Sequence, residues 1–145
     1  MERGVRAGYI NKSEGLNMVA FSEQAVAVYA LDDDSSFLRS TRRLLDSAGY
    51  KVETFTDPIA FLERAAMHRP EVAVIDIRMP EMNGLDVQTR LRTVSPSTRV
   101  IILTSKNDPS VRMLAMNAGA SDFFIKGVQN EELLAGIKAA ADSRN

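Results

Sequence analysis

Residues 72–84 read Val72-Ala73-Val74-Ile75-Asp76-Ile77-Arg78-Met79-Pro80-Glu81-Met82-Asn83-Gly84. A short apolar run rich in β-branched residues, ending in an acid before a loop with proline and glycine, is typical of a buried parallel strand. Such a strand carries the Asp76 carboxylate to the carboxyl edge of a sheet, where open α/β sheets bind their ligands. The stretch therefore predicts an α/β fold with a ligand site at Asp76.

A second acidic group, Asp32-Asp33-Asp34, follows the apolar run at residues 26–31. Because parallel strands bring their carboxyl ends to one edge, we expect these acids to lie near Asp76. Carboxylates packed together repel one another unless a cation is bound. Mg²⁺ suits such a site because it prefers oxygen ligands, and an aspartate there can act as a nucleophile toward phosphorus. The pattern predicts a divalent-metal site beside a carboxylate that accepts a phosphoryl group.

Composition excludes several classes of function. The 145 residues carry 18 basic and 19 acidic side chains, a net charge of -1 that gives no electrostatic case for binding nucleic acid. There is no cysteine and only one histidine, so thiolate chemistry and histidine metal sites are excluded. No apolar run is long enough to span a bilayer. Arg3 and Arg6 have no apolar run behind them, so these residues are not expected to form a secretory signal. We therefore expect a cytoplasmic protein without membrane association.

Strand and helix patterns alternate along the chain. Strands are expected at 25–31, 51–55, 72–76, 99–104 and 122–125, and helices at 35–48, 58–68, 84–94, 109–118 and 130–142. Five βα units imply a parallel sheet covered on both faces, joined by right-handed crossovers. Residues 25–142 are thus expected to form one domain. Residues 1–22 show no periodicity and are interpreted as a disordered leader or a cloning remnant.

Local patterns give further expectations about individual residues. Ser35 or Ser36 can cap the first helix, with the third acid Asp34 as another candidate, and Asn130 is expected to cap the last. Helical spacing places Ile59 on the inward face of the second helix. The fourth helix carries two methionines, which are expected to pack in the interior, namely Met113 and Met116.

Several motifs at strand ends occur together in one order. They are Leu31-Asp32-Asp33-Asp34, Asp76 with Met79-Pro80 and Asn83-Gly84, Leu103-Thr104-Ser105, Gly119-Ala120-Ser121-Asp122-Phe123, and Ile125-Lys126. With this set, the chain resembles the response-regulator receiver domains of two-component signalling from about Ala25 to Asp142. The resemblance implies a flavodoxin-like three-layer sandwich with strand order 2-1-3-4-5 and five helices. It also implies a regulatory phosphoacceptor, not an enzyme.

The resemblance assigns roles to the acids. Asp76 is the expected phosphoacceptor and a ligand of Mg²⁺. Asp33 is expected to bind the metal directly, Asp32 to act through a metal-bound water, and the backbone carbonyl of Arg78 to complete the protein ligands.

It also assigns roles to the residues around them. Thr104 and Lys126 are expected to contact the phosphoryl oxygens, and Phe123 to be the aromatic switch. Phe124, adjacent on the strand, must then point to the opposite face. A sensor histidine kinase is the implied donor, and the surface at 109–125 is a candidate for self-association.

The chain departs from the family pattern in three ways. Gly127 follows Lys126 where the family usually has proline, so a cis peptide is not expected there. Arg78 and Lys106 lie two residues beyond Asp76 and Thr104, and two cationic side chains at these positions predict a long-lived aspartyl-phosphate. No output domain is predicted within the 145 residues, although the sequence of residues 78–85 resembles that of receivers fused to helix-turn-helix DNA-binding activators.

Two alternatives remain open at this stage. The Asp-x-Asp spacing of Asp32 and Asp34 is shared with haloacid-dehalogenase-type phosphatases, which would use Asp32 as the nucleophile. Against this, the chain lacks a cap domain and a later acidic pair. The second alternative is a receiver that no longer accepts phosphate and only binds partners, which the substitution at Gly127 keeps open.

Overall fold

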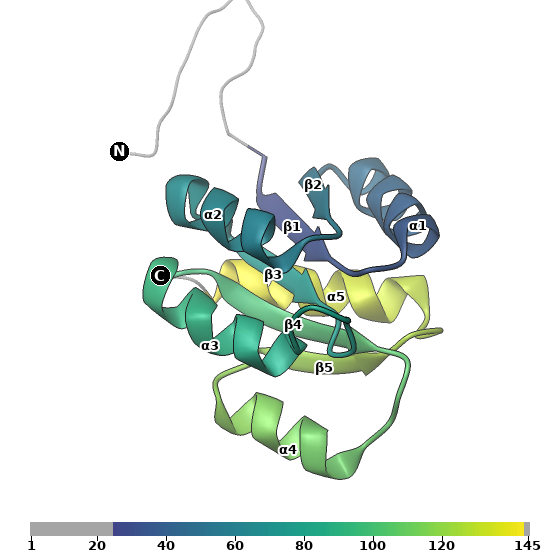
Figure 1. Ribbon diagram of the computed structural model, residues 1–145. Helices are drawn as coiled ribbons and strands as arrows, with labels where there is room; N and C mark the ends of the chain where they lie inside the picture. The colour runs from purple at the N-terminus through teal and green to yellow at the C-terminus, as the bar shows by residue number, and fades with distance from the viewer. Residues whose placement is uncertain (1–24, 144–145) are drawn as a thin grey trace, which may run out of the picture.

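The computed structural model describes residues 25–143 (Figure 1). Its strands are β1 (Ala27–Leu31), β2 (Lys51–Phe55), β3 (Val72–Ile75), β4 (Arg99–Thr104) and β5 (Asp122–Ile125). Its helices are α1 (Ser35–Ser47), α2 (Pro58–His68), α3 (Gly84–Val94), α4 (Pro109–Asn117) and α5 (Asn130–Asp142). All ten predicted elements are confirmed, with ends within two residues of their expected positions. The predicted leader at 1–22 lies outside the described residues.

One parallel sheet organises the chain, with the strand order β2-β1-β3-β4-β5. This confirms the predicted flavodoxin-like order. The register pairs Leu31 with Ile75, and Ile75 with Ile102, so β1, β3 and β4 end side by side. The ladder continues one residue further, because the N–H of Asp76 donates to the Leu31 carbonyl at 3.0 Å. The residues that follow these strands therefore share one edge of the sheet.

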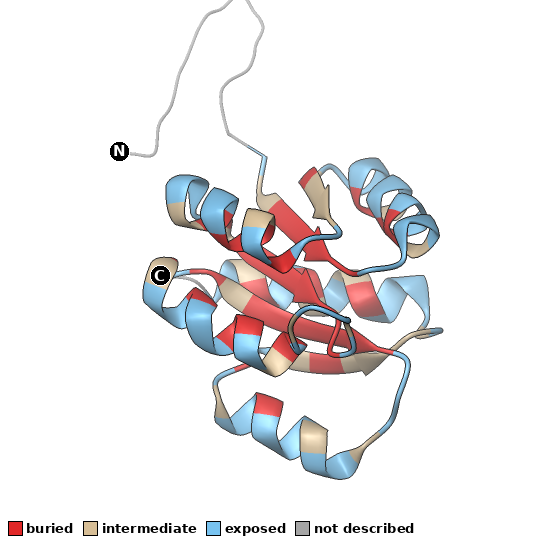
Figure 2. Ribbon diagram, viewed as in Figure 1, coloured by how far each residue is buried: buried red, intermediate tan, exposed pale blue. Residues whose placement is uncertain are grey.

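Both faces of the sheet are buried, as expected for parallel strands whose crossover helices cover them. Side chains alternate along each strand. Ile75, Ile102 and Phe123 belong to the core beneath α2, α3 and α4, whereas Val74 and Ile101 belong to the core beneath α1 and α5. Figure 2 shows the strands as the buried layer between exposed helix surfaces. Within residues 25–143, no helix combines the length and apolarity that crossing a bilayer requires.

The cap of α1 is one of the predicted candidates, whereas the cap of α5 is not. Asp34 caps α1, because its carboxylate accepts hydrogen bonds from the N–H groups of Ser36 and Phe37 at 3.0 and 3.2 Å. The alternative caps Ser35 and Ser36 are wrong, since both lie within the first turn. At α5, Gln129 occupies the cap position without a side-chain bond, and Asn130 is the first helical residue.

The packing predicted for three apolar side chains is also wrong. Helix α2 turns Phe61 inward, and this register leaves Ile59 exposed. Helix α4 buries only Ala115 and lies over the edge strand β5, so it is covered less completely than the other helices. Met113 is consequently 62% exposed, and Met116 is exposed as well. Figure 2 shows α4 as mainly exposed surface.

Candidate functional site

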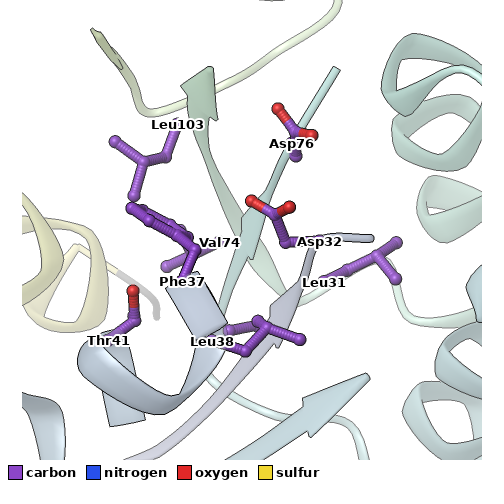
Figure 3. Close-up of a pocket in the computed structure, with 9 residues that line it drawn as sticks. Leu31, Asp32, Phe37, Leu38, Thr41, Val74, Asp76 and Leu103 are labelled. Carbon is purple, nitrogen blue, oxygen red and sulfur yellow. The ribbon is translucent and has the colours of Figure 1, made fainter. Parts of the chain in front are cut away.

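The acids that the sequence singled out converge at the carboxyl edge of the sheet. Asp32 and Asp76 are buried at the ends of neighbouring strands, and Asp33 is exposed beside them. One carboxylate oxygen from each lies within 4.8 Å of the others. Figure 3 shows Asp32 and Asp76 close together above the ends of β1 and β3. Three converging carboxylates are a suitable donor set for a hard divalent cation.

The electrostatics of Asp76 also favour a cation. The pKa of this carboxyl is raised from 3.8 to about 6, first by burial and then by the negative charges of Asp32 and Asp33, while the Lys126 ammonium works in the opposite direction. Among residues 25–143, the buried Oδ1 atom of Asp76 has no hydrogen-bond partner. The site therefore holds more negative charge, and fewer hydrogen bonds, than a buried carboxyl usually tolerates.

Lys126 is the cation that the protein itself supplies. Its Nζ lies 2.7 Å from Oδ2 of Asp32 and 3.9 Å from Oδ1 of Asp76, and the side chain is 20% exposed. Its backbone N–H donates to the carbonyl of Thr104 at 2.7 Å, which ties the end of β5 to the end of β4. The sequence prediction that Lys126 joins the acid cluster is confirmed.

The glycine after this lysine has a local structural reason. Residues 125–128 form a tight turn in which the N–H of Val128 donates to the carbonyl of Ile125 at 3.1 Å. Gly127 has φ 99°, a conformation that glycine adopts readily and that proline, with φ fixed near −65°, cannot adopt. As expected, no peptide bond within residues 25–143 is cis. The turn holds Lys126 at the cluster without the family's usual proline.

Thr104 and Phe123 lie on the neighbouring strands β4 and β5. Thr104 is buried at the end of β4, and its hydroxyl has no hydrogen-bond partner in the described part of the chain. Phe123 is buried in the core beneath α4, whereas Phe124 packs on the other face, as predicted. Arg112 of α4 covers Phe123, with the guanidinium carbon 5.3 Å from the ring centroid and Nη1 donating to the Phe123 carbonyl at 3.4 Å.

The Asn83-Gly84 motif closes the loop that carries Asp76. The N–H of Gly84 donates to the Ile77 carbonyl at 2.8 Å, and the Asn83 side chain accepts from the N–H of Leu85 at 2.7 Å, which caps α3. A Cβ at Gly84 would collide with the backbone carbonyl of Asp76. Only glycine therefore permits this close approach. The predicted ligand Arg78 lies in this loop, lining an open pocket with Asp33.

The sequence comparison now identifies the family. The profile of the response regulator receiver domain matches residues 28–138. The chain belongs to the response regulator receiver domain family. It is accordingly a regulatory phosphoacceptor domain of the two-component type and not a conventional enzyme. Family membership also speaks against the haloacid-dehalogenase-type alternative.

Individual relatives agree with this assignment. The response regulator protein TodT of Pseudomonas putida is 38% identical over 119 residues, which cover 82% of this chain and 52% of TodT. MprA of Mycobacterium leprae is 38% identical over 112 residues, covering 77% of this chain and 49% of MprA. The chain thus spans about half the length of the curated relatives it matches.

Solved structures give the same fold. A CheY-like receiver domain protein from Methanospirillum hungatei superposes with a TM-score of 0.79 at 26% identity, covering 83% of this chain and 97% of that one. The receiver domain of the putative response regulator NarL from Mycobacterium tuberculosis superposes with a TM-score of 0.76 at 30% identity. The match covers 84% of this chain and 100% of that one. The arrangement of strands and helices is therefore that of receiver domains throughout residues 25–143.

Proposed function

We propose that Asp76 is the phosphoacceptor of this receiver and takes its phosphoryl group from the phosphohistidine of a sensor kinase. The observation that carries the proposal is the buried Asp76 carboxylate, which lies beside two other acids and one lysine and has one oxygen without a hydrogen-bond partner among residues 25–143. A buried carboxylate in this state is costly to stability, and groups with such perturbed pKa values are found preferentially at functional sites. The raised pKa of about 6 still leaves Asp76 largely ionised at neutral pH.

The chemistry is a single phosphoryl transfer. An Asp76 oxygen attacks phosphorus, the P–O bond to Asp76 forms, and the P–N bond to the donor imidazole breaks. Negative charge on the phosphoryl oxygens must be held by positioned donors. The Lys126 ammonium is one such donor, and the buried Thr104 hydroxyl, which has no partner of its own, is another.

We assign the cation to Mg²⁺ because the donors are oxygens and the carboxylates converge. Asp33 and Asp76 would bind it directly, Asp32 through a water, and the carbonyl of Arg78 would complete the protein ligands. When bound, Mg²⁺ supplies charge neutralisation for the carboxylates and for the phosphoryl oxygens. The unpartnered Oδ1 of Asp76 supports this assignment, because a cation would satisfy it.

Phosphorylation is expected to act as a switch by shifting an existing equilibrium between two conformations. Thr104 and Phe123 are the proposed moving parts, and the surface at 109–125 is the proposed output. That surface exposes Met113, Leu114 and Met116, an apolar group suited to self-association. The beryllofluoride-activated receiver of NtrC4, 25% identical with a TM-score of 0.78, is described as a dimer. We further infer a cytoplasmic location.

Intact mass after incubation with acetyl phosphate and Mg²⁺ tests the acceptor. Wild type should gain one phosphoryl group, and Asp76→Asn should gain none. Asp86→Asn, which alters an exposed aspartate in the first turn of α3, is the matched control and should behave as wild type. A gain that survives Asp76→Asn would place the acceptor elsewhere. No gain in wild type would support the alternative of a phosphorylation-independent binding module.

A further inference from the structure

An aromatic ring from α1 faces the lysine of the site. Nζ of Lys126 lies 4.3 Å from the centroid of the Phe37 ring. The half-buried ring lines the same narrow cavity as Asp32 and Asp76, as Figure 3 shows. We propose that Phe37 is a positioning residue for phosphoryl transfer, because its ring face holds the Lys126 ammonium at the acid cluster. This inference rests on the proposed role of Asp76.

The physical basis is the attraction between a cation and the negative face of an aromatic ring. It operates within about 6 Å of the centroid and is stronger when the cation is partly removed from water. Both conditions hold for Lys126, which is 20% exposed. The side chain has a flexible four-carbon stem, so the turn at Gly127 fixes its backbone but not its ammonium. The ammonium is instead fixed by Asp32 on one side and by Phe37 on another.

A ring positions the ammonium without competing strongly for its hydrogen bonds. A lysine has three N–H donors. One is directed to Asp32 at 2.7 Å, and Asp76 is still 3.9 Å away. A carboxylate or amide at position 37 would take a second donor, whereas the ring face leaves it for a phosphoryl oxygen on Asp76. An aromatic residue is therefore a better support at this position than a polar one.

The backbone of Phe37 is fixed by the same acidic motif that supplies the site. The Phe37 N–H donates to the Asp34 carboxylate at 3.2 Å, and the Asp34 N–H donates to Oδ1 of Asp32 at 2.9 Å. Asp32 in turn pairs with Lys126, which lies against the Phe37 ring. Four residues thus form a closed circuit of contacts. The role of Asp34 in this circuit is to fix the start of α1, and with it the backbone of Phe37.

Fluorinated phenylalanines at position 37 test the electrostatic part of this inference. One, two and three ring fluorines progressively remove the negative potential of the face while largely preserving shape. The rate of phosphorylation by acetyl phosphate with Mg²⁺ should fall stepwise, by about two- to tenfold over the series, the range expected for a cation–π contact. Phe37→Leu should lower the rate by a similar factor, whereas Phe37→Trp should be phosphorylated at about the rate of wild type. The same series at Phe124, a half-buried phenylalanine on β5, should leave the rate unchanged.

A second readout reports the contact before any phosphorylation. The ε-methylene protons of Lys126 should show an upfield ring-current shift in the NMR spectrum of the resting protein, and Phe37→Leu should abolish it. If the fluorinated variants were all phosphorylated at the wild-type rate, or if the upfield shift were absent, the role of Phe37 would be overturned. The proposed role of Asp76 would stand. A wild type that is not phosphorylated would remove the proposed function, and this inference with it.

Discussion

Two buried polar clusters lie at opposite edges of the same sheet, and they are built differently. At the amino edge, Thr98 donates to the Pro70 carbonyl at 2.7 Å, and its oxygen lies 2.6 Å from the Ser95 hydroxyl. Because Thr98 has a single hydroxyl proton, Ser95 must be the donor between the two. At the carboxyl edge, Oδ1 of Asp76 and the hydroxyl of Thr104 have no hydrogen-bond partner within the described residues.

The difference separates a structural cluster from a functional one. The amino-edge cluster is neutral and its hydroxyl protons are used, so it contributes to stability. The carboxyl-edge cluster gathers Asp32, Asp33 and Asp76 around one lysine, and the raised pKa of Asp76 shows that its ionised form is disfavoured there. A site that accepts a phosphoryl group needs unused donors and unneutralised charge. The two clusters can be tested against each other by substitution.

The largest effect is expected from removing the charge of Asp76. Its pKa is raised from 3.8 in the unfolded chain to about 6 in the folded state. The folded state therefore binds the proton of the Asp76 carboxyl more tightly than the unfolded chain does. The contribution of this proton to folding stability is complete below about pH 4 and is lost as pH rises through about 6. At pH 7 without divalent cations, Asp76→Asn should exceed wild type in unfolding free energy by up to about 3 kcal/mol. Urea unfolding between pH 4 and pH 8 measures this difference.

Two controls accompany that measurement. The advantage of Asp76→Asn should shrink toward pH 4, where wild type is protonated as well. At pH 7, excess Mg²⁺ should reduce the difference in unfolding free energy between Asp76→Asn and wild type, because the cation stabilises the wild-type cluster with its charged Asp76. A difference that stayed constant across pH would mean that packing or hydrogen bonding, not ionisation, distinguishes the two proteins.

Thr98→Val tests the cluster at the amino edge. The substitution keeps the shape of the side chain but leaves the Ser95 hydroxyl without its acceptor and the Pro70 carbonyl without its donor. We expect a loss of about 1–3 kcal/mol in unfolding free energy, the range for unsatisfied buried polar groups. Phosphorylation by acetyl phosphate should proceed at the rate of wild type. Unchanged stability would show that this cluster is not structural.

Much of this organisation could be predicted from the sequence because it depends on periodicity and side-chain chemistry. The alternating patterns gave the order of the elements, and parallel strands necessarily bring their carboxyl ends together, so Asp32 and Asp76 were expected to meet. The lysine was expected at the same edge, since it follows the last strand directly.

What the sequence did not predict depends on tertiary packing. A helical period identifies the apolar side of α4. It does not predict that α4 packs so incompletely on the edge strand that Met113 remains exposed. The contact of Phe37 with Lys126 joins residues 89 positions apart and depends on where the lysine side chain turns. At Gly127 the sequence shows only that the family's usual proline is replaced, whereas the structure shows that the positive φ of this glycine closes a tight turn.

A smaller effect is expected at the mouth of the carboxyl-edge cluster. Arg78 and Lys106 are both exposed, and long cationic side chains there could obstruct or reorient the water that hydrolyses an aspartyl-phosphate. Replacing both with alanine should speed dephosphorylation several-fold, a change of about 1 kcal/mol in the barrier. Intact mass followed over time, after acetyl phosphate is removed, gives the rate. A lifetime that is unchanged or longer in the double variant would contradict this explanation.

The smallest change in stability is expected from Thr104→Val, the same substitution as Thr98→Val in the other cluster. The Thr104 hydroxyl is buried without a partner, so its removal breaks no hydrogen bond. The unfolding free energy should change by less than about 0.5 kcal/mol, or rise slightly, because an unsatisfied buried group is removed. Phosphorylation should nevertheless be slower than in wild type. If Thr104→Val were as destabilising as Thr98→Val, the hydroxyl would have a structural partner and the contrast between the two edges would fail.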